Sequence, residues 1–214
     1  MVVLEPLKVT LTNWAADRVH QCVAPNFPKE PARGSRNVPL TRTLWIDRSD
    51  FKEEDSKTFY GLTVGKEAHL KYGFNVRCDS VVRDPATGAV VELLCSVDET
   101  NATKCKGNLH WVSAERPGEA PVVAEARLYD HLFLSEDPMS VENWLGDLNP
   151  TSEVVLSHVY CEPSLRNAKP QDRFQFERVG FFVCDFDTKS GADGRLVFNR
   201  TTKLKESKEK ASSS

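Results

Sequence analysis

The sequence predicts an all-β protein made of packed β-barrels, and three observations predict it. Residues 174–178 read Phe-Gln-Phe-Glu-Arg and alternate apolar with polar side chains, which is the period of two typical of a β-strand. Turn-forming residues separate about ten strand-like segments, a spacing that indicates barrels or sandwiches. The chain has 214 residues with a short helical segment in the middle of each half, which favours two barrels over one.

The first predicted strands lie on either side of a proline-rich connection. Residues 4–11 form an extended segment, and residues 38–46 form the next strand. Between them, residues 25–36 contain three prolines, which favour an extended shape, and Gly34, which permits a sharp bend.

A short helix is predicted over residues 49–59, followed by a β-hairpin. Asp50 can cap this helix, and Glu53 stands three residues later as in a capping box. The hairpin pairs residues 68–82 with residues 89–97 across a turn-forming Asp-Pro-Ala-Thr-Gly loop.

The second half of the chain continues with strands, one short helix and a polar tail. The helix is predicted over residues 140–145, and residues 207–214 are expected to form a disordered tail because they bury little apolar surface. The remaining strands are predicted over residues 108–113, 122–134, 154–161, 174–178, 179–184 and 195–201.

The composition favours a cytoplasmic protein without a membrane anchor. No apolar run approaches the roughly 20 residues of a membrane helix, and the amino terminus lacks the features of a signal peptide. The six cysteines include no C-x-x-C pair and are interpreted as buried thiols of a reducing compartment. The net charge of −3 argues against coating nucleic acid by bulk charge, so any RNA contact must be a local basic surface.

The sequence offers no convincing catalytic centre. None of the five histidines lies in an H-x-x-x-H or H-E-x-x-H pattern, and no phosphate loop or nucleophile elbow occurs. His110 is interpreted as a structural histidine. The acidic residues at positions 47, 50, 53 and 54 are interpreted as a solvated helix face rather than a metal site. We therefore expect no independent enzyme and no metal or cofactor in this chain.

The polar residues of 174–178 can read an unpaired base. The amide of Gln175 offers both a donor and an acceptor, Arg178 offers a rigid fork of donors, and Glu177 can orient that fork. The alternative is a solvated ion pair on a strand, which is the usual role of such surface charges.

Several motifs in one order resemble the C-terminal anticodon-binding region of the glutaminyl-tRNA synthetase family. The resemblance implies two antiparallel β-barrels: a proximal barrel from residues 1–62 and 136–206, and an inserted distal barrel from residues 63–135. The motifs that carry it lie at residues 25–36, 45–48, 65–67, 107–114, 127–133, 162–165, 174–178 and 197–201.

The resemblance also implies a function and partners. The family is a class I synthetase that joins glutamine to its tRNA with ATP and magnesium, and neither class I signature (HIGH or KMSKS) occurs here. We therefore expect a module that binds the tRNA(Gln) anticodon loop, with the catalytic domain of the same polypeptide absent, and with no membrane or DNA partner. Two alternatives stay open: the anticodon-binding domain of a glutamyl-tRNA synthetase, and a free-standing RNA-binding or protein-interaction β-barrel.

The resemblance assigns roles to residues at both ends of the chain. Residues matching Gln175 and Arg178 contact the central uracil of the anticodon, and Glu177 matches a residue that positions the arginine. The proline-rich segment matches a loop near the anticodon, which places Asn26 and Lys29 in the predicted site. Arg36 either contacts RNA or anchors the strand that follows it.

The chain departs from the bacterial pattern after the predicted helix. Tyr60 and Gly61 replace a lysine and an arginine that contact the anticodon, His69 replaces a further arginine, and Lys71 is the following basic position. Tyr60 either stacks on a base or packs against the barrel seam. Thr58 completes the predicted set, and candidates for phosphate contacts are Lys66, Lys71 and Arg77.

Overall fold

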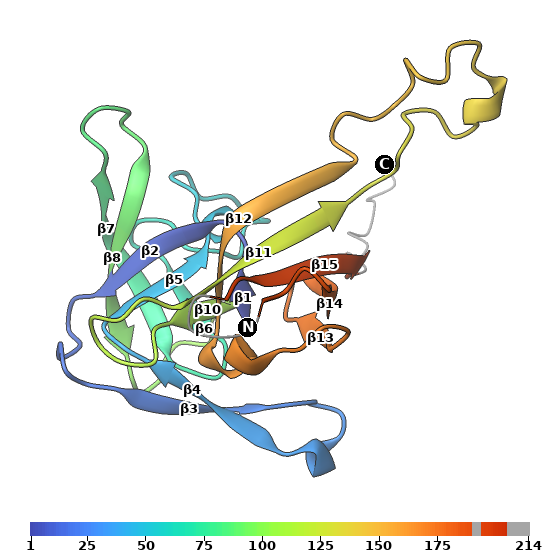
Figure 1. The fold of residues 1–214 in the computed structure, drawn as a ribbon. Helices are drawn as coiled ribbons and strands as arrows, with labels where there is room; N and C mark the ends of the chain where they lie inside the picture. Colours follow the sequence, from blue (N-terminus) through green and yellow to red (C-terminus); the bar gives the residue numbers. More distant parts are fainter. Residues whose placement is uncertain (190–193, 205–214) are drawn as a thin grey trace. The chain divides into compact units, whose positions relative to one another are not determined.

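The computed structural model describes residues 1–189 and 194–204, and it is all-β (Figure 1). The predicted fold class is confirmed: the sheets form a nearly closed barrel and a half-barrel, joined by 3-10 turns rather than long helices. The chain divides into two compact units. Unit 1 holds Met1–Ala124 and His158–Asn167, and unit 2 holds Glu125–Ser157 and Ala168–Ser214. The barrel boundaries at residues 62 and 135 stay a prediction.

A seven-stranded sheet provides most of the core of unit 1. Most strand pairs are antiparallel, but β2 pairs with β8 in parallel and β6 pairs with β9 in parallel. The predicted hairpin of residues 68–82 and 89–97 is confirmed by the antiparallel pair β7–β8. In order, the sheet runs β10 (Trp111–Ser113), β5 (Thr43–Asp47), β2 (Pro6–Leu11), β8 (Val90–Asp98), β7 (Asn75–Arg83), β6 (Glu67–Leu70) and β9 (Asn108–Leu109).

A two-stranded ribbon occupies the region predicted as a proline-rich connection. Strand β3 (His20–Pro25) pairs with β4 (Ser35–Leu40), and the short 3-10 helix η1 (Pro31–Arg33) lies in the loop between them. Strand β3 was not predicted. The short strand β1 (Val2–Val3) pairs with the end of β12.

Unit 2 is built on five strands of a six-stranded sheet, whose remaining strand is β1 of unit 1. Strands β11 (Val122–Tyr129) and β12 (Glu153–Cys161) each run from one unit into the other. The order continues from β12 and β11 through β15 (Leu196–Lys203) and β14 (Gly180–Cys184) to β13 (Arg173–Phe176). Two further 3-10 helices are η3 (Pro138–Ser140) and η4 (Pro163–Asn167), the latter in unit 1.

Both predicted helices are wrong. Residues 49–59 contain only the 3-10 helix η2 (Arg48–Asp50), and its cap is Asp47, whose side chain accepts a hydrogen bond from the amide of Ser49 at 3.2 Å. Asp50 is buried instead of exposed at a helix start. Residues 140–145 begin at the end of η3 and continue as turns.

Three predicted strands are each interrupted. Residues 38–46 break between β4 and β5 at positions 41–42, residues 68–82 break between β6 and β7, and residues 108–113 break between β9 and β10 at position 110. The second break contains Tyr72 with φ 67°, a conformation that no strand accommodates.

The remaining sequence-based expectations concern thiols, metals, membranes and the tail. The six cysteines are free, and five of them are buried. Across residues 1–189 and 194–204, no cluster of three potential metal-ligating side chains occurs. In that same part of the chain, no helix has the length and apolar character needed to cross a bilayer. The predicted tail, residues 207–214, lies outside the described residues.

Candidate nucleic-acid interface

A phenylalanine cluster supports the hairpin that carries Gln175. The ring of Phe176 stacks on Phe182 with centroids 4.3 Å apart and meets Phe198 edge-on at 5.2 Å. Phe174 adds a second edge-on contact with Phe198 at 5.9 Å. The rings of Phe174 and Phe176 lie on the same face of β13, as the alternating sequence predicts. Their contacts with Phe182 and Phe198 hold the strand in a fixed position.

Gln175 and Arg178 lie at the outer part of this hairpin. Gln175 is exposed on β13, the last strand in the sheet order, and pairs with Phe181 of β14. Arg178 is not on the strand as predicted: β13 ends at Phe176, and Arg178 lies in a turn closed by a 3.0 Å hydrogen bond from the amide of Val179 to the carbonyl of Phe176. Glu177 precedes it and is half-buried. The turn therefore presents Gln175, Glu177 and Arg178 from one short segment of unit 2.

The tip of the β3–β4 ribbon carries Asn26 and Lys29. The amide of Asn26 donates a 2.9 Å hydrogen bond to the carbonyl of Arg33, and its backbone amide donates a 3.0 Å bond to the carbonyl of Gly34. Lys29 is exposed. The side chain of Asn26 thus braces the loop, while Lys29 presents its charge to solvent.

Arg36 is held inside unit 1 by a buried carboxylate. Its Nη2 donates to Oε2 of Glu162 at 3.2 Å, and its Nη1 donates to the carbonyl of Pro25 at 3.0 Å. Burial would raise the pKa of Glu162, but the neighbouring Met1 amino group and Arg36 outweigh it and lower that pKa to about 2. This geometry favours the anchoring alternative for Arg36 over direct RNA contact.

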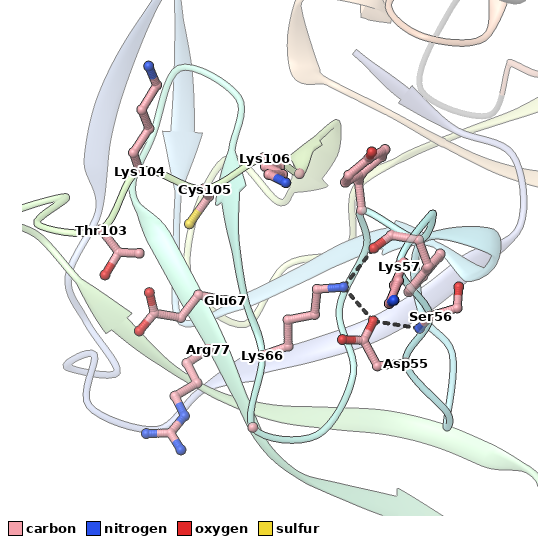
Figure 2. A pocket seen from close by; sticks show the side chains of 14 residues that line it. Asp55, Ser56, Lys57, Lys66, Glu67, Arg77, Thr103, Lys104, Cys105 and Lys106 are labelled. Carbon is pink, nitrogen blue, oxygen red and sulfur yellow. Dashed lines mark hydrogen bonds and ion pairs between the residues drawn. The ribbon is translucent and has the colours of Figure 1, made fainter. Parts of the chain in front are cut away.

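A basic hollow of about 480 Å³ gathers several other predicted residues in unit 1 (Figure 2). Tyr60 and Lys66 of the predicted site both line it, as does Arg77. Further cationic side chains in its walls are Lys57, Lys104 and Lys106. Sequence reasoning missed these three lysines.

Lys66 acts as a brace within this hollow. Its Nζ donates to Oδ1 of Asp55 at 2.5 Å and to the carbonyl of Phe59 at 2.6 Å, as the dashed lines of Figure 2 mark. The hydrogen bond from Lys66 lowers the pKa of Asp55. Thr58, in the same segment, is exposed but does not line the hollow. Lys66 thus has a structural partner, Asp55, in addition to the phosphate contact that the sequence predicts for it.

Tyr60 is 53% exposed. A side chain packed into a barrel seam would be largely covered, so this exposure favours the stacking alternative for Tyr60.

His69 and Lys71 lie on and just after β6, outside the hollow. A hydrogen bond of 2.9 Å joins His69 Nδ1 to Oδ1 of Asn75. The ammonium of Lys71 lies 5.4 Å from the ring centroid of Tyr72. His110, interpreted as structural, is 4% exposed and lies 3.8 Å from Asp50.

The predicted site residues therefore form three groups. One is the turn after β13 in unit 2, the second is the β3–β4 ribbon tip, and the third is the basic hollow, both of these in unit 1. The Lys-Cys-Lys run that precedes Gly107 is the sequence signal that could have revealed two of the missed lysines, because alternating basic residues before a strand indicate one charged face.

Comparison with known proteins identifies the family to which the chain is similar. Two family models, both described as anticodon-binding domains of class I tRNA synthetases (E and Q), match residues 1–98 and residues 108–185. Among similar curated proteins, a glutamine–tRNA ligase of Lupinus luteus is 43% identical over 210 residues, which is 97% of this chain and 26% of the relative. One of Pseudomonas putida is 44% identical over 216 residues, which is 97% of this chain and 37% of the relative. The chain thus spans about a quarter to a third of the relatives it matches.

Proposed function

The chain belongs to the anticodon-binding domains of the class I glutamate and glutamine tRNA synthetases, and we propose that it recognises the anticodon loop of a glutamine tRNA. The observation that carries the proposal is the family match over residues 1–98 and 108–185, combined with relatives named glutamine–tRNA ligases at 43–44% identity. These names favour glutamine over glutamate as the amino acid that the parent protein attaches.

We assign the catalytic step, the attachment of glutamine to tRNA, to another part of the same polypeptide. The chain covers only 26–37% of the Lupinus and Pseudomonas relatives, so a catalytic domain in the same polypeptide would attach glutamine using ATP and magnesium. A relative from Arabidopsis thaliana, 41% identical over 211 residues, is named a cytoplasmic glutamine–tRNA ligase. We accordingly place the parent protein in the cytoplasm.

Gln175 and Arg178 are proposed to read the central uracil of the anticodon. Uracil presents one N–H donor between two carbonyl acceptors, so the Gln175 carbonyl accepts from the N–H and the Arg178 guanidinium donates to a carbonyl. Glu177 positions the arginine. The rigid Phe176 contacts keep this set ordered before RNA arrives, which lowers the entropic cost of binding.

A titration with an anticodon stem-loop tests the proposal. Gln175→Ala should reduce the preference for a central uracil over a central cytosine by about 1–3 kcal/mol, if the value for base readout in DNA transfers. The matched control is Gln21→Ala, because Gln21 is an exposed glutamine on strand β3 of the other unit. Equal loss of affinity for both stem-loops would show that Gln175 is not a reader.

The glutamate alternative is tested on the full-length parent. We expect the parent protein to charge glutamine tRNA with glutamine and not to charge glutamate tRNA with glutamate. Transfer of glutamate to its own tRNA would overturn the assignment while leaving the RNA-binding role intact.

A further inference from the structure

We infer that the basic hollow binds one unpaired nucleotide of the tRNA, with its base stacked on Tyr60 and its phosphate held by Lys57 and Lys106. The inference rests on the proposed function and names residues that would replace the missing lysine–arginine pair. The volume of about 480 Å³ lies within the usual range for small-ligand sites, roughly 300–1,000 Å³.

Charge distribution is the first argument. The chain carries a net charge of −3, yet the hollow is lined by five cationic side chains and two acidic ones. One of the five, Lys66, is already bonded to Asp55. Lys57 and Lys106 are exposed, and within the described part of the chain neither forms an ion pair. Their charges are thus available to a phosphate, which an ammonium binds as a point charge.

Backbone packing is the second argument, because it fixes the position of Tyr60. A Cβ atom on Gly107 would lie 1.8 Å from the carbonyl oxygen of Tyr60, and one on Gly61 would lie 2.2 Å from that of Asp50. The backbone at Gly107 therefore lies directly against the carbonyl of Tyr60. The backbone at Gly61, the residue after Tyr60, lies directly against the carbonyl of Asp50. A ring that is 53% exposed on a backbone so closely packed is a pre-organised stacking platform.

Strand pairing is the third argument, because it joins the two walls of the hollow. Strands β6 and β9 pair in parallel through His69 and Asn108, and the amide of His69 donates a 2.9 Å hydrogen bond to the carbonyl of Gly107. Lys106 directly precedes that residue, so the pairing places it beside β6, and Gly107 itself lies against the carbonyl of Tyr60. Figure 2 shows Lys57 and Lys106 on different segments around the hollow.

The stacking half of the inference is tested by titrating the 214-residue chain with an anticodon stem-loop. Tyr60→Ala should weaken binding about 5- to 150-fold, the range expected for loss of one stacked base. Tyr60→Phe keeps the ring and should change affinity less than about twofold. Equal affinity of the alanine variant and the parent chain would overturn the stacking role.

The phosphate half is tested by the salt dependence of the same binding. Lys57→Gln and Lys106→Gln should each reduce the slope of log affinity against log salt, and together they should reduce it by about 0.7, the value for one phosphate of a single strand. The control is Lys8→Gln, because Lys8 is a partly exposed lysine of the same unit that is paired with Glu92 at 3.3 Å. An unchanged slope in both hollow variants would overturn the phosphate contacts.

These outcomes are separable from those of the proposed function. The hollow variants should lose affinity while keeping the preference for a central uracil, whereas Gln175→Ala should lose the preference. Loss of uracil preference in Tyr60→Ala would place the central base in the hollow and overturn the assignment of a separate nucleotide to it.

Discussion

Arg178 has a backbone conformation that its side chain does not favour. Its φ of 65° lies in the left-handed region, which costs a non-glycine residue roughly 1–2 kcal/mol. Such strain collects at functional sites, where the side chain is required for its chemistry. The strained turn is therefore compatible with the proposed role of the Arg178 guanidinium in recognition.

Replacing Arg178 with glycine should separate stability from recognition. Glycine adopts positive φ freely, so Arg178→Gly should leave the free energy of unfolding unchanged or raise it by up to about 1 kcal/mol. The same variant should lose about 1–3 kcal/mol of preference for a central uracil. Thermal unfolding and stem-loop titration measure the two effects. Gln171→Gly is the matched control, because Gln171 is exposed with φ 73° in the same unit; a destabilised Arg178→Gly would contradict the strain argument.

Arg36 should matter for stability more than for RNA. Arg36→Ala leaves the buried carboxylate of Glu162 without its guanidinium and should cost about 3 kcal/mol of unfolding free energy, the lower end for breaking a buried pair because the Arg36 side chain is 22% exposed. Arg33→Ala removes an exposed pair with Glu30 and should cost less than about 1 kcal/mol. Urea denaturation measures both. Weaker stem-loop binding by a fully stable Arg36→Ala would favour the RNA-contact alternative instead.

Local sequence signals predicted the strands well and the helices badly. Alternation placed Gln175 outward and Phe176 inward because a strand has only two faces. The acidic run after Asp50 has the pattern of a helix start, but Asp50 is buried, and the carbonyl of Asp50 accepts the amide of Leu62 at 2.8 Å. That long-range bond holds the segment in an irregular path, and no local pattern reveals it.

The hollow was missed because its walls come from distant segments. Lys57 and Lys106 line the same hollow from separate segments, and the β6–β9 register that places Lys106 is not encoded in either short strand alone. Tyr60 was recognised only because it departs from a known pattern. The sequence therefore predicts which side chains share one face of a strand. It does not predict a site whose walls come from several segments of the chain.

The hollow depends on the close backbone contact between Gly107 and the carbonyl of Tyr60. Gly107→Ala places a methyl group against the Tyr60 carbonyl and should cost about 1–3 kcal/mol of unfolding free energy by overpacking. It should also weaken stem-loop binding, because the Tyr60 backbone must shift. Gly73→Ala, whose Cβ would meet no atom closer than 3.4 Å, should change both quantities little. Unfolding midpoint and stem-loop affinity are the measurements; unchanged binding in a destabilised Gly107→Ala would separate the hollow from Tyr60.

Basic side chains cluster locally in the hollow, although the net charge of the chain is −3. A chain with net charge −3 repels RNA weakly at long range, so the proposed recognition requires local basic groups such as those of the hollow and the exposed Lys29. This arrangement suits a module that must discriminate between tRNAs, because bulk attraction raises affinity for every RNA equally.

The stability of the 214-residue chain, in which Met1 carries a free amino group, should depend on pH through Glu162. Burial raises the pKa of this carboxyl, but the Met1 amino group and Arg36 lower it to about 2, below its ordinary value of 4.5. The charged form is therefore favoured in the folded state. Its stabilising contribution, about 3 kcal/mol, is present above pH 4.5 and is lost as the pH falls from 4.5 toward 2.

Glu162→Gln should remove this dependence. The variant should be less stable than the parent chain at pH 6, and the difference should shrink as the pH falls below 4.5, as measured by urea denaturation across that range. Glu115→Gln is the control, because Glu115 is an exposed partner of Arg166 at 3.5 Å and should leave the pH profile almost unchanged. Parallel profiles for Glu162→Gln and the parent chain would show that the buried pair does not govern acid stability, since a neutral amide has no proton to gain as the pH falls.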